Sequence, residues 1–273
     1  MEYSCPELLQ YLEKLHTNNI CTAKQALSME DSHKAFLVQN DPISCDRYFN
    51  HKVWKFPNFL KQKNCLFGKY QVEDTFEKVE FQARGSAHEH IFLWLKDAPT
   101  YVPHSNNESL IEFIDNFLTC ENNKCIPFIT YLQHKHTHTC YKGRRKRKFC
   151  RFNFSLPVMP RTVILEPFPK EDDLADVKQN FSNIRSLHEK FFRQEQDVSF
   201  ETILSELGIS EHDYILAIRS YIKRPQIFLK RGSLDVSINS YNIDILSLFE
   251  SNIDIQFVLD EFDAANYVIN YIC

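Results

Sequence analysis

The chain has 273 residues, 43% of them hydrophobic, and a formal net charge of −4 at pH 7. Such a chain can bury a sizeable core in one large domain or two small ones, and its charge excludes a uniformly basic nucleic-acid binder. Its five glycines form neither a GxxxxGK nor a GxGxxG loop, so a nucleotide-binding loop is not supported.

No apolar run reaches the roughly 18 residues of a membrane span, and the N-terminus does not have the pattern of a signal peptide. We therefore expect an intracellular, non-secreted protein with no membrane partner. Nine cysteines, an odd number without secretory context, favour reduced thiols, some of them on a metal, over a framework of disulfides.

Residues 1–40 have the spacing of helices, and Thr22 is a plausible N-cap for the second of them. The next stretch, residues 40–62, mixes apolar and aromatic residues with basic ones. Two interpretations of this stretch stay open: a helix packed on a sheet, or a surface close to DNA.

Residues 79–95 predict two strands joined by a turn, because VEFQ precedes the turn and the apolar run IFLWL ends the segment. Residues two apart on a strand project from the same face, so His88 and His90 point the same way, and so do Glu80 and Gln82. If the strands are neighbours, two imidazoles and one oxygen ligand can hold a divalent metal and leave positions open for a substrate.

Residues 108–119 predict an amphipathic helix, after which the composition changes. Within residues 120–161 lie seven cysteines and histidines: Cys120, Cys125, His134, His136, His138, Cys140 and Cys150. Thiols and imidazoles at such spacing suit tetrahedral zinc. The alternative is a histidine-rich strand with scattered buried cysteines.

The loop between the last two of these cysteines is strongly basic. Its cations, with the one that follows, are Lys142, Arg144, Arg145, Lys146, Arg147, Lys148 and Arg151. Such a cluster attracts phosphates and gives binding a salt dependence, so we predict contact with a DNA backbone. A solvated loop is the alternative.

The rest of the chain predicts helices over residues 170–225, then short strands and turns over residues 226–258. Ile253, Ile255 and Phe257 alternate with polar residues, as in a half-buried strand. Residues 259–272 have helical spacing, and Tyr267 and Tyr271, four residues apart, share one face of that helix.

Several of these stretches resemble the nuclease domain of Helitron transposases, which belong to the HUH (His-hydrophobe-His) class of rolling-circle replication initiators. The matching stretches are EFQARGSAHEHIFLWLKDAP, the spaced residues DP…C..YF..KV, LQHKHTHTC…CRFNF, and NIDIQFVLD followed by a Tyr-x3-Tyr pair. The resemblance covers most of residues 35–165 and 226–272, and it is weak over residues 170–225.

The resemblance implies an α+β fold with an HUH-nuclease-like central antiparallel sheet flanked by helices. Residues 1–273 would form a single domain, with a Cys/His module at 120–161 and a helical insert at 170–225. The implied activity is metal-dependent nicking of single-stranded DNA and strand transfer, in which Tyr267 and Tyr271 are the catalytic nucleophiles. Mg²⁺ or Mn²⁺ would be bound by His88, His90 and Gln82, with Glu80 as the alternative third ligand.

The same resemblance selects the zinc ligands: His134, His136, Cys140 and Cys150, with Cys120 or Cys125 as substitutes. It also includes Arg231, for which DNA contact and structural hydrogen bonding are both open, and it implies a nuclear location and a helicase domain as partner. Glu89 stands where the family has a hydrophobic residue, so the alternative function is a catalytically inactive DNA-binding remnant. A structural zinc protein without a DNA role is the third possibility.

Overall fold

The computed structural model describes residues 5–62, 66–81, 87–126, 128–137, 140–142, 149–168 and 175–272. The chain divides into two compact units. The first unit comprises Met1–Ala98, Asp244–Asn252 and Asp260–Cys273, and the second comprises Pro99–Ile243 and Ile253–Leu259.

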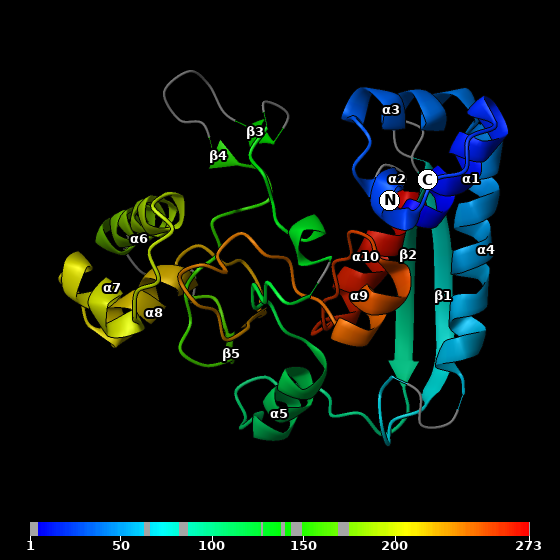
Figure 1. Cartoon of the computed structure of the whole chain (residues 1–273). Coiled ribbons are helices and arrows are strands. Elements are labelled where there is room, and N and C mark those ends of the chain that lie inside the picture. Colours follow the sequence, from blue (N-terminus) through cyan, green and yellow to red (C-terminus); the bar gives the residue numbers. More distant parts are fainter. Residues whose placement is uncertain are drawn as a thin grey trace. The chain divides into compact units, whose positions relative to one another are not determined.

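Four helices begin the first unit: α1 (Pro6–Thr17), α2 (Ala23–Leu27), α3 (Asp31–Asn40) and α4 (Pro42–Leu60). The antiparallel hairpin of β1 (Val72–Phe81) and β2 (Ala87–Leu95) follows them (Figure 1). Two helices from the end of the chain, α9 (Ile243–Phe249) and α10 (Glu261–Ile272), belong largely or wholly to this unit.

Local signals explain where the helices of the first unit begin. At the start of α2 the Thr22 side chain accepts from the Gln25 backbone N–H, and the Gln25 side chain accepts from the Thr22 backbone N–H. This capping box confirms the predicted cap. A cluster of buried aliphatic residues and Cys45, to which α1, α2, α3 and α4 all contribute, forms the nearby core.

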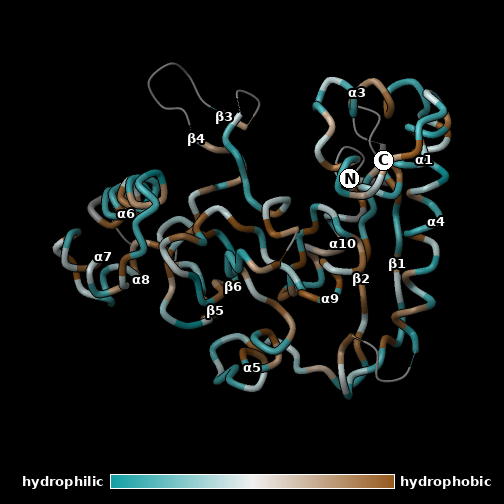
Figure 2. Tube along the Cα trace, in the orientation of Figure 1, coloured by the Kyte–Doolittle hydropathy of each residue, from teal (hydrophilic) through white to brown (hydrophobic). Residues whose placement is uncertain are grey.

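Helix α4 and the hairpin have one apolar side each. Phe49, Val53 and Phe56 are buried at helical spacing on α4, and the ring of Phe56 meets Phe249 of α9 edge to face at 4.7 Å. Strand β2 is the more hydrophobic strand of the hairpin (Figure 2). The hairpin thus pairs a more hydrophobic strand with a more polar one.

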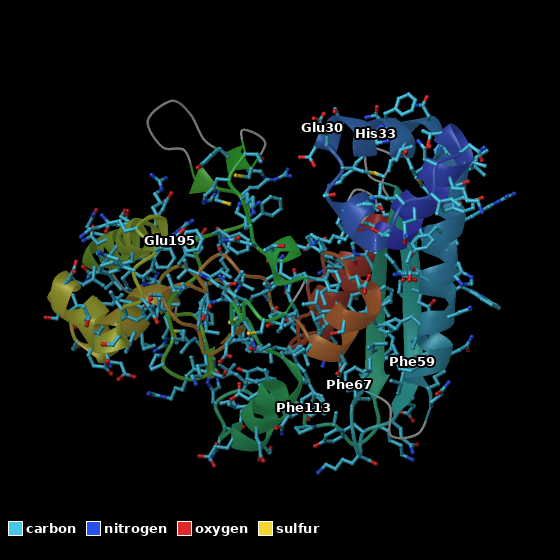
Figure 3. The ribbon with its side chains drawn as sticks, viewed as in Figure 1. Glu30, His33, Phe59, Phe67, Phe113 and Glu195 are labelled. Atoms are coloured by element: carbon cyan, nitrogen blue, oxygen red, sulfur yellow. The ribbon has the colours of Figure 1, made fainter. Side chains whose placement is uncertain are left out.

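The second unit contains α5 (Glu108–Phe117), the short 3₁₀ helix η2 (Ile129–Tyr131), α6 (Ala175–Arg193), α7 (Phe200–Leu207) and α8 (Glu211–Arg219). Its strands are β3 (Tyr141–Lys142), β4 (Phe149–Cys150), β5 (Val163–Leu165) and β6 (Gln226–Phe228), which pair as β3–β4 and β5–β6. The core lies around α6, α7 and α8, where the buried Tyr214 donates to the carbonyl oxygen of Val158 at 2.9 Å. On α5, the Phe113 ring contacts those of Phe117 and Phe257. Phe113 is labelled in Figure 3.

The predicted combination of helices with antiparallel strands is confirmed, but the described strands form three separate two-stranded sheets where one central sheet was expected. Residues 253–257 show the expected alternating burial, yet no strand is assigned there in the described part of the chain; the Ile255 N–H donates to the Ser240 carbonyl oxygen. Residues 243–249, expected as strands and turns, form α9, because Ile245, Leu246 and Phe249 fall on one side of a helix.

Candidate active site and metal centre

One face of the β1–β2 hairpin gathers the predicted metal-binding residues. The register pairs Glu80 with His88 and Lys78 with His90. Because side chains alternate between the two faces of a strand, these four residues project from the same face. The structure therefore places both imidazoles and Glu80, the alternative third ligand, on one face, where His90 and Glu80 are in contact.

Tyr267 of α10 reaches this face of the hairpin. Its hydroxyl oxygen lies 2.8 Å from Nδ1 of His90, and Nε2 of the same imidazole lies 3.1 Å from Oε2 of Glu80. The Tyr267 ring also meets the Phe92 ring edge to face at 6.0 Å. A carboxylate, an imidazole and a phenol thus form a continuous row, which can hold the hydroxyl in place and exchange its proton.

The pKa of the second imidazole of the motif, His88, is lowered. Burial lowers the pKa of His88, and the neighbouring His90 lowers it further. A neutral imidazole offers a lone pair to a metal ion or a proton, and the lowered pKa of His88 favours this form.

Glu89, between the two histidines, projects from the opposite face of the hairpin, where it pairs with Val79. Burial raises the pKa of Glu89 to about 7, and the charge of Glu77 adds to the rise. Near neutral pH this side chain is therefore protonated for much of the time. The neutral form costs less to bury, which explains how the strand accommodates an acid at this position.

Two predicted residues of this site fall outside the described part of the chain. They are Gln82, the preferred third ligand, and the side chain of Tyr271, of which only the backbone in α10 is described. Among the predicted oxygen ligands and nucleophiles, Glu80 and Tyr267 are accordingly the two residues whose side-chain contacts the structure describes.

Four residues of the Cys/His module converge in the second unit. The ligand atoms of His134, His136, Cys140 and Cys150 all lie within 4.8 Å of one another. Two nitrogen–sulfur distances, His136 Nδ1 to Cys140 Sγ and His134 Nε2 to Cys150 Sγ, are each 3.4 Å. Tetrahedral zinc, with bonds of about 2.0 Å to nitrogen and about 2.3 Å to sulfur, separates its ligand atoms by about 3.3–3.8 Å. This group could hold a metal ion such as zinc.

Short local contacts position these ligands. The pairing of β3 with β4 brings Cys150 beside the residue that follows Cys140, and the Arg151 N–H donates to the Cys140 carbonyl oxygen at 2.8 Å. The His134 ring stacks on Phe154 with centroids 4.4 Å apart. Both cysteines and Phe154 are buried, which limits the access of water to the thiols.

The alternative zinc ligands are not part of this group. Cys120 is buried, its thiol donates to the Lys230 carbonyl oxygen at 3.2 Å, and burial raises the pKa of this thiol to about 11. Cys125 is exposed, and His138 lies outside the described residues. The geometry therefore favours the four residues that the resemblance selected.

The predicted basic surface is described only at its ends. Lys142 and Arg151 are both exposed, and the Arg151 guanidinium lies over the Phe152 ring at 4.5 Å. The cations between them lie outside the described residues: Arg144, Arg145, Lys146, Arg147 and Lys148.

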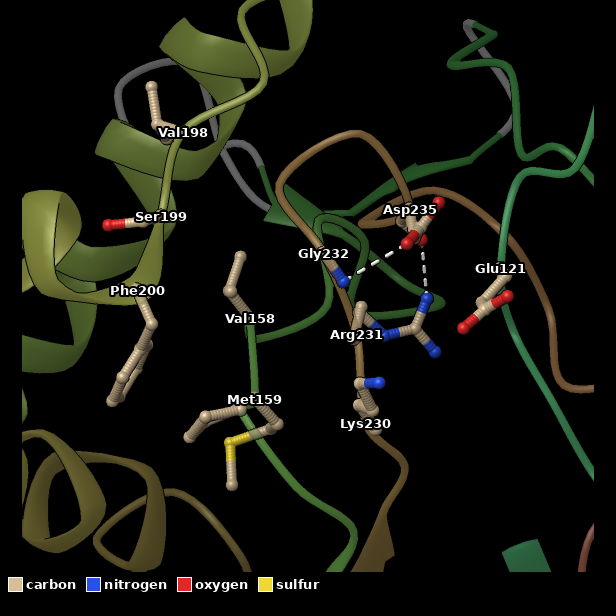
Figure 4. A pocket seen from close by; sticks show the side chains of 11 residues that line it. Glu121, Val158, Met159, Val198, Ser199, Phe200, Lys230, Arg231, Gly232 and Asp235 are labelled. Atoms are coloured by element: carbon tan, nitrogen blue, oxygen red, sulfur yellow. Dashed lines mark hydrogen bonds between the residues drawn. The ribbon is translucent and has the colours of Figure 1, made fainter.

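Arg231 has a structural environment. This residue is 7% exposed, and its Nη1 donates to the carbonyl oxygens of Asp235 and Ile238. Figure 4 shows the contact with Asp235. The Asp235 carboxylate in turn accepts from the Gly232 N–H at 3.0 Å, so the two side chains brace one turn beside a cavity of about 220 Å³. Of the two roles left open for Arg231, hydrogen bonding within the fold is the one that these contacts favour.

Sequence reasoning overlooked the aromatic supports of both sites. Phe92 follows His90 by two residues, so the alternation that groups the histidines also predicts the face on which Phe92 lies. Phe154 lies close to Cys150 in the sequence and stacks on an imidazole of the cluster. Aromatic residues close in sequence to the ligands were the available signal.

No protein-family model, no curated protein and no solved structure matches this chain. Function is therefore inferred from the two sites and from the sequence resemblance. Among the helices that the structure describes, none has both the length and the apolar character needed to cross a membrane.

Proposed function

We propose that the first unit is an HUH-type, metal-dependent nuclease that nicks single-stranded DNA and transfers the cut strand, as part of a Helitron rolling-circle transposase in the nucleus. The observation that carries the proposal is the 2.8 Å distance between the Tyr267 hydroxyl and His90. These residues are 177 positions apart in the sequence, and a nuclease of this kind needs them in one site. The HUH-like sheet arrangement and a helicase partner belong to the same proposal.

The donor set suits Mg²⁺ or Mn²⁺. Mg²⁺ prefers octahedral coordination with bonds of about 2.1 Å, which places neighbouring ligand atoms about 3 Å apart. The 3.1 Å separation between Glu80 Oε2 and His90 Nε2 agrees with that spacing. His88 and either Gln82 or Glu80 complete the proposed ligand set. When bound, the metal would polarise the scissile phosphate as a Lewis acid.

His90 has a second role toward the nucleophile. With a metal bound at Nε2, Nδ1 would carry the proton and would donate a hydrogen bond to the Tyr267 oxygen, 2.8 Å away. A hydrogen bond to the charged form of a group favours that form, so this contact favours the phenolate of a tyrosine whose free pKa is about 10.

The reaction is an exchange of phosphate esters. The Tyr267 oxygen attacks phosphorus, a bond between that oxygen and phosphorus forms, and the bond from phosphorus to the 3′-oxygen of the DNA breaks. The tyrosine proton passes to solvent and the leaving 3′-oxygen takes a proton from water. The resulting 5′-phosphotyrosine bond retains the energy for rejoining, and Tyr271 would serve a second cleavage.

Covalent capture of DNA tests this proposal. Wild-type protein is incubated with a 5′-labelled and a 3′-labelled single-stranded oligonucleotide and Mn²⁺, then separated on a denaturing gel. We expect an adduct that carries the 3′ label, its loss in Tyr267→Phe, and its retention in Tyr11→Phe, which changes an exposed tyrosine on α1. An adduct that survives in Tyr267→Phe would refute the assigned nucleophile.

A catalytically inactive DNA-binding protein is the second candidate, and the half-buried Glu89 favours it. In that case the wild-type protein forms no adduct but still retards single-stranded DNA. For the Cys/His group we propose a structural zinc ion, because all four tetrahedral positions are filled by protein ligands. The adjoining basic loop, Lys142–Lys148 with Arg151, would then contact the DNA backbone.

A further inference from the structure

Helix α4 exposes an aromatic residue that the proposed nuclease site does not use. Trp54 is 74% exposed, while Phe49, Val53 and Phe56 of the same helix are buried. An exposed side chain of this size is unusual, because burying an aromatic ring is strongly favourable. The indole is therefore available for a partner outside the chain.

Cations lie along the same side of α4. At about 100° per residue, Arg47 and Lys61, each seven residues from Trp54, fall within about 20° of its direction. They lie about 10 Å from it along the helix axis, one on each side. Both are exposed, and within the described residues neither side chain forms an ion pair or hydrogen bond.

The charge of this helix differs from that of the whole chain. Helix α4 and Lys61, which follows it, contain four cations, Arg47, Lys52, Lys55 and Lys61, and one carboxylate, Asp46, although the whole chain has a net charge of −4. Lys52 is engaged within the unit, 3.9 Å from Glu7 and over the Tyr48 ring. Lys55 lies 3.2 Å from His51 Nε2. Arg47 and Lys61 are therefore the two cations of this set that are available to attract an anion.

We propose that this Trp54 face, defined by Arg47, Trp54 and Lys61, binds single-stranded DNA. The indole stacks on one base, and the two cations contact phosphates on either side. This combination of an aromatic platform with flanking cations is how proteins bind single strands without reading sequence. The assignment rests on the proposed function, since that reaction requires a single strand, and it adds a surface that holds the strand away from the reacting phosphate.

Charge complementarity favours DNA over a second copy of the chain. Two copies packed through this face would bring Arg47 and Lys61 of one against the same cations of the other, which repel. The apolar part of the face is also small, since Ile43 is the one exposed aliphatic residue of α4 in line with Trp54. Single-stranded DNA can pair its phosphates with the two cations and stack a base on the indole ring.

Tryptophan fluorescence reports this contact directly. The chain has two tryptophans, so Trp94→Phe leaves Trp54 as the single emitter. We expect an oligothymidylate to quench the emission of that variant. By anisotropy of a labelled strand, Trp54→Ala should weaken binding roughly tenfold or more. Arg47→Ala and Lys61→Ala should each lower the salt slope by about 0.7, whereas Lys24→Ala, a cation on α2, should not.

Two results would overturn the inference: unquenched Trp54 emission at saturating oligothymidylate, or equal affinities for Trp54→Ala and its parent. If the protein dimerises in a concentration-dependent way and Trp54→Ala abolishes the dimer, the partner of this face is a second copy of the chain and not DNA. The adduct assay separates this inference from the proposed function. If the adduct forms but Trp54 emission is not quenched, the proposed nuclease activity stands and DNA binding by the Trp54 face is refuted. If Trp54 emission is quenched but no adduct forms, DNA binding by the Trp54 face stands and the proposed nuclease activity is refuted. The thermal unfolding of Trp54→Ala, at so exposed a site, should match that of its parent.

Discussion

Cys150→Ser gives the sharpest test of the metal centre. The substitution removes one of four ligand atoms that lie within 4.8 Å of one another, and it leaves the buried Cys140 and His134 without a shared ion. We expect the purified variant to contain little zinc and to lose order around the β3–β4 ribbon. Cys125→Ser is the matched control, because Cys125 is exposed and lies outside the cluster.

The expected loss of zinc affinity follows from the number of ligands. Structural zinc sites contribute about 10–16 kcal/mol of apparent binding free energy at pH 7. An even share among four ligands is about 3 kcal/mol, so the loss of one should weaken zinc binding roughly 100-fold. The apolar cluster here comprises Cys140, Cys150 and Phe154 with Leu156 beside them, so little other packing replaces the metal.

Metal content and hydrogen exchange measure the two consequences. Inductively coupled plasma mass spectrometry should find about one zinc per wild-type chain and per Cys125→Ser chain. The Arg151 amide, which donates to Cys140, should exchange faster in Cys150→Ser and in chelator-treated wild type. A wild-type protein that contains no zinc after expression in zinc-supplemented medium, with exchange unaffected by chelator, would refute the reasoning.

Two buried titratable groups predict how stability varies with pH. Burial lowers the pKa of His188 to about 3, so between about pH 6.5 and 3 the unfolded chain binds a proton that the folded chain does not. The free energy of unfolding should therefore fall by up to about 1.4 kcal/mol for each pH unit by which the pH is lowered across that window. In urea titrations, His188→Gln should reduce this dependence on pH, and an unchanged dependence would contradict the assignment to His188. Glu89 behaves oppositely, because its pKa is raised to about 7 and the folded chain keeps a proton that the unfolded chain releases near pH 4. Glu89→Gln should raise the free energy of unfolding by about 1 kcal/mol at pH 8, after allowance for solvent screening, with no gain at pH 4; an equal gain at both pH values would point to packing as the cause.

Local regularities in the sequence determined where several helices lie and which residues share one face of a strand. The cap at Thr22, the helix at 108–119 and the helical stretch at 259–272 depend on a few neighbouring residues and on the helical repeat. The strand repeat of two was enough to place His88 and His90 on one face. Three of the four metal ligands lie within residues 134–140, so their convergence needed little help from distant parts of the chain.

The tertiary structure determined which residues from distant parts of the chain lie together. It placed Tyr267 against His90, chose Cys150 over Cys120 beside the histidines, and buried Arg231 inside a turn. Within the described part of the chain, it also left residues 253–257 without a strand partner despite their alternation. A periodic sequence specifies which side of an element is apolar. Which other element covers that side depends on the packing of residues more than a hundred positions apart, and that is fixed only when the whole core forms.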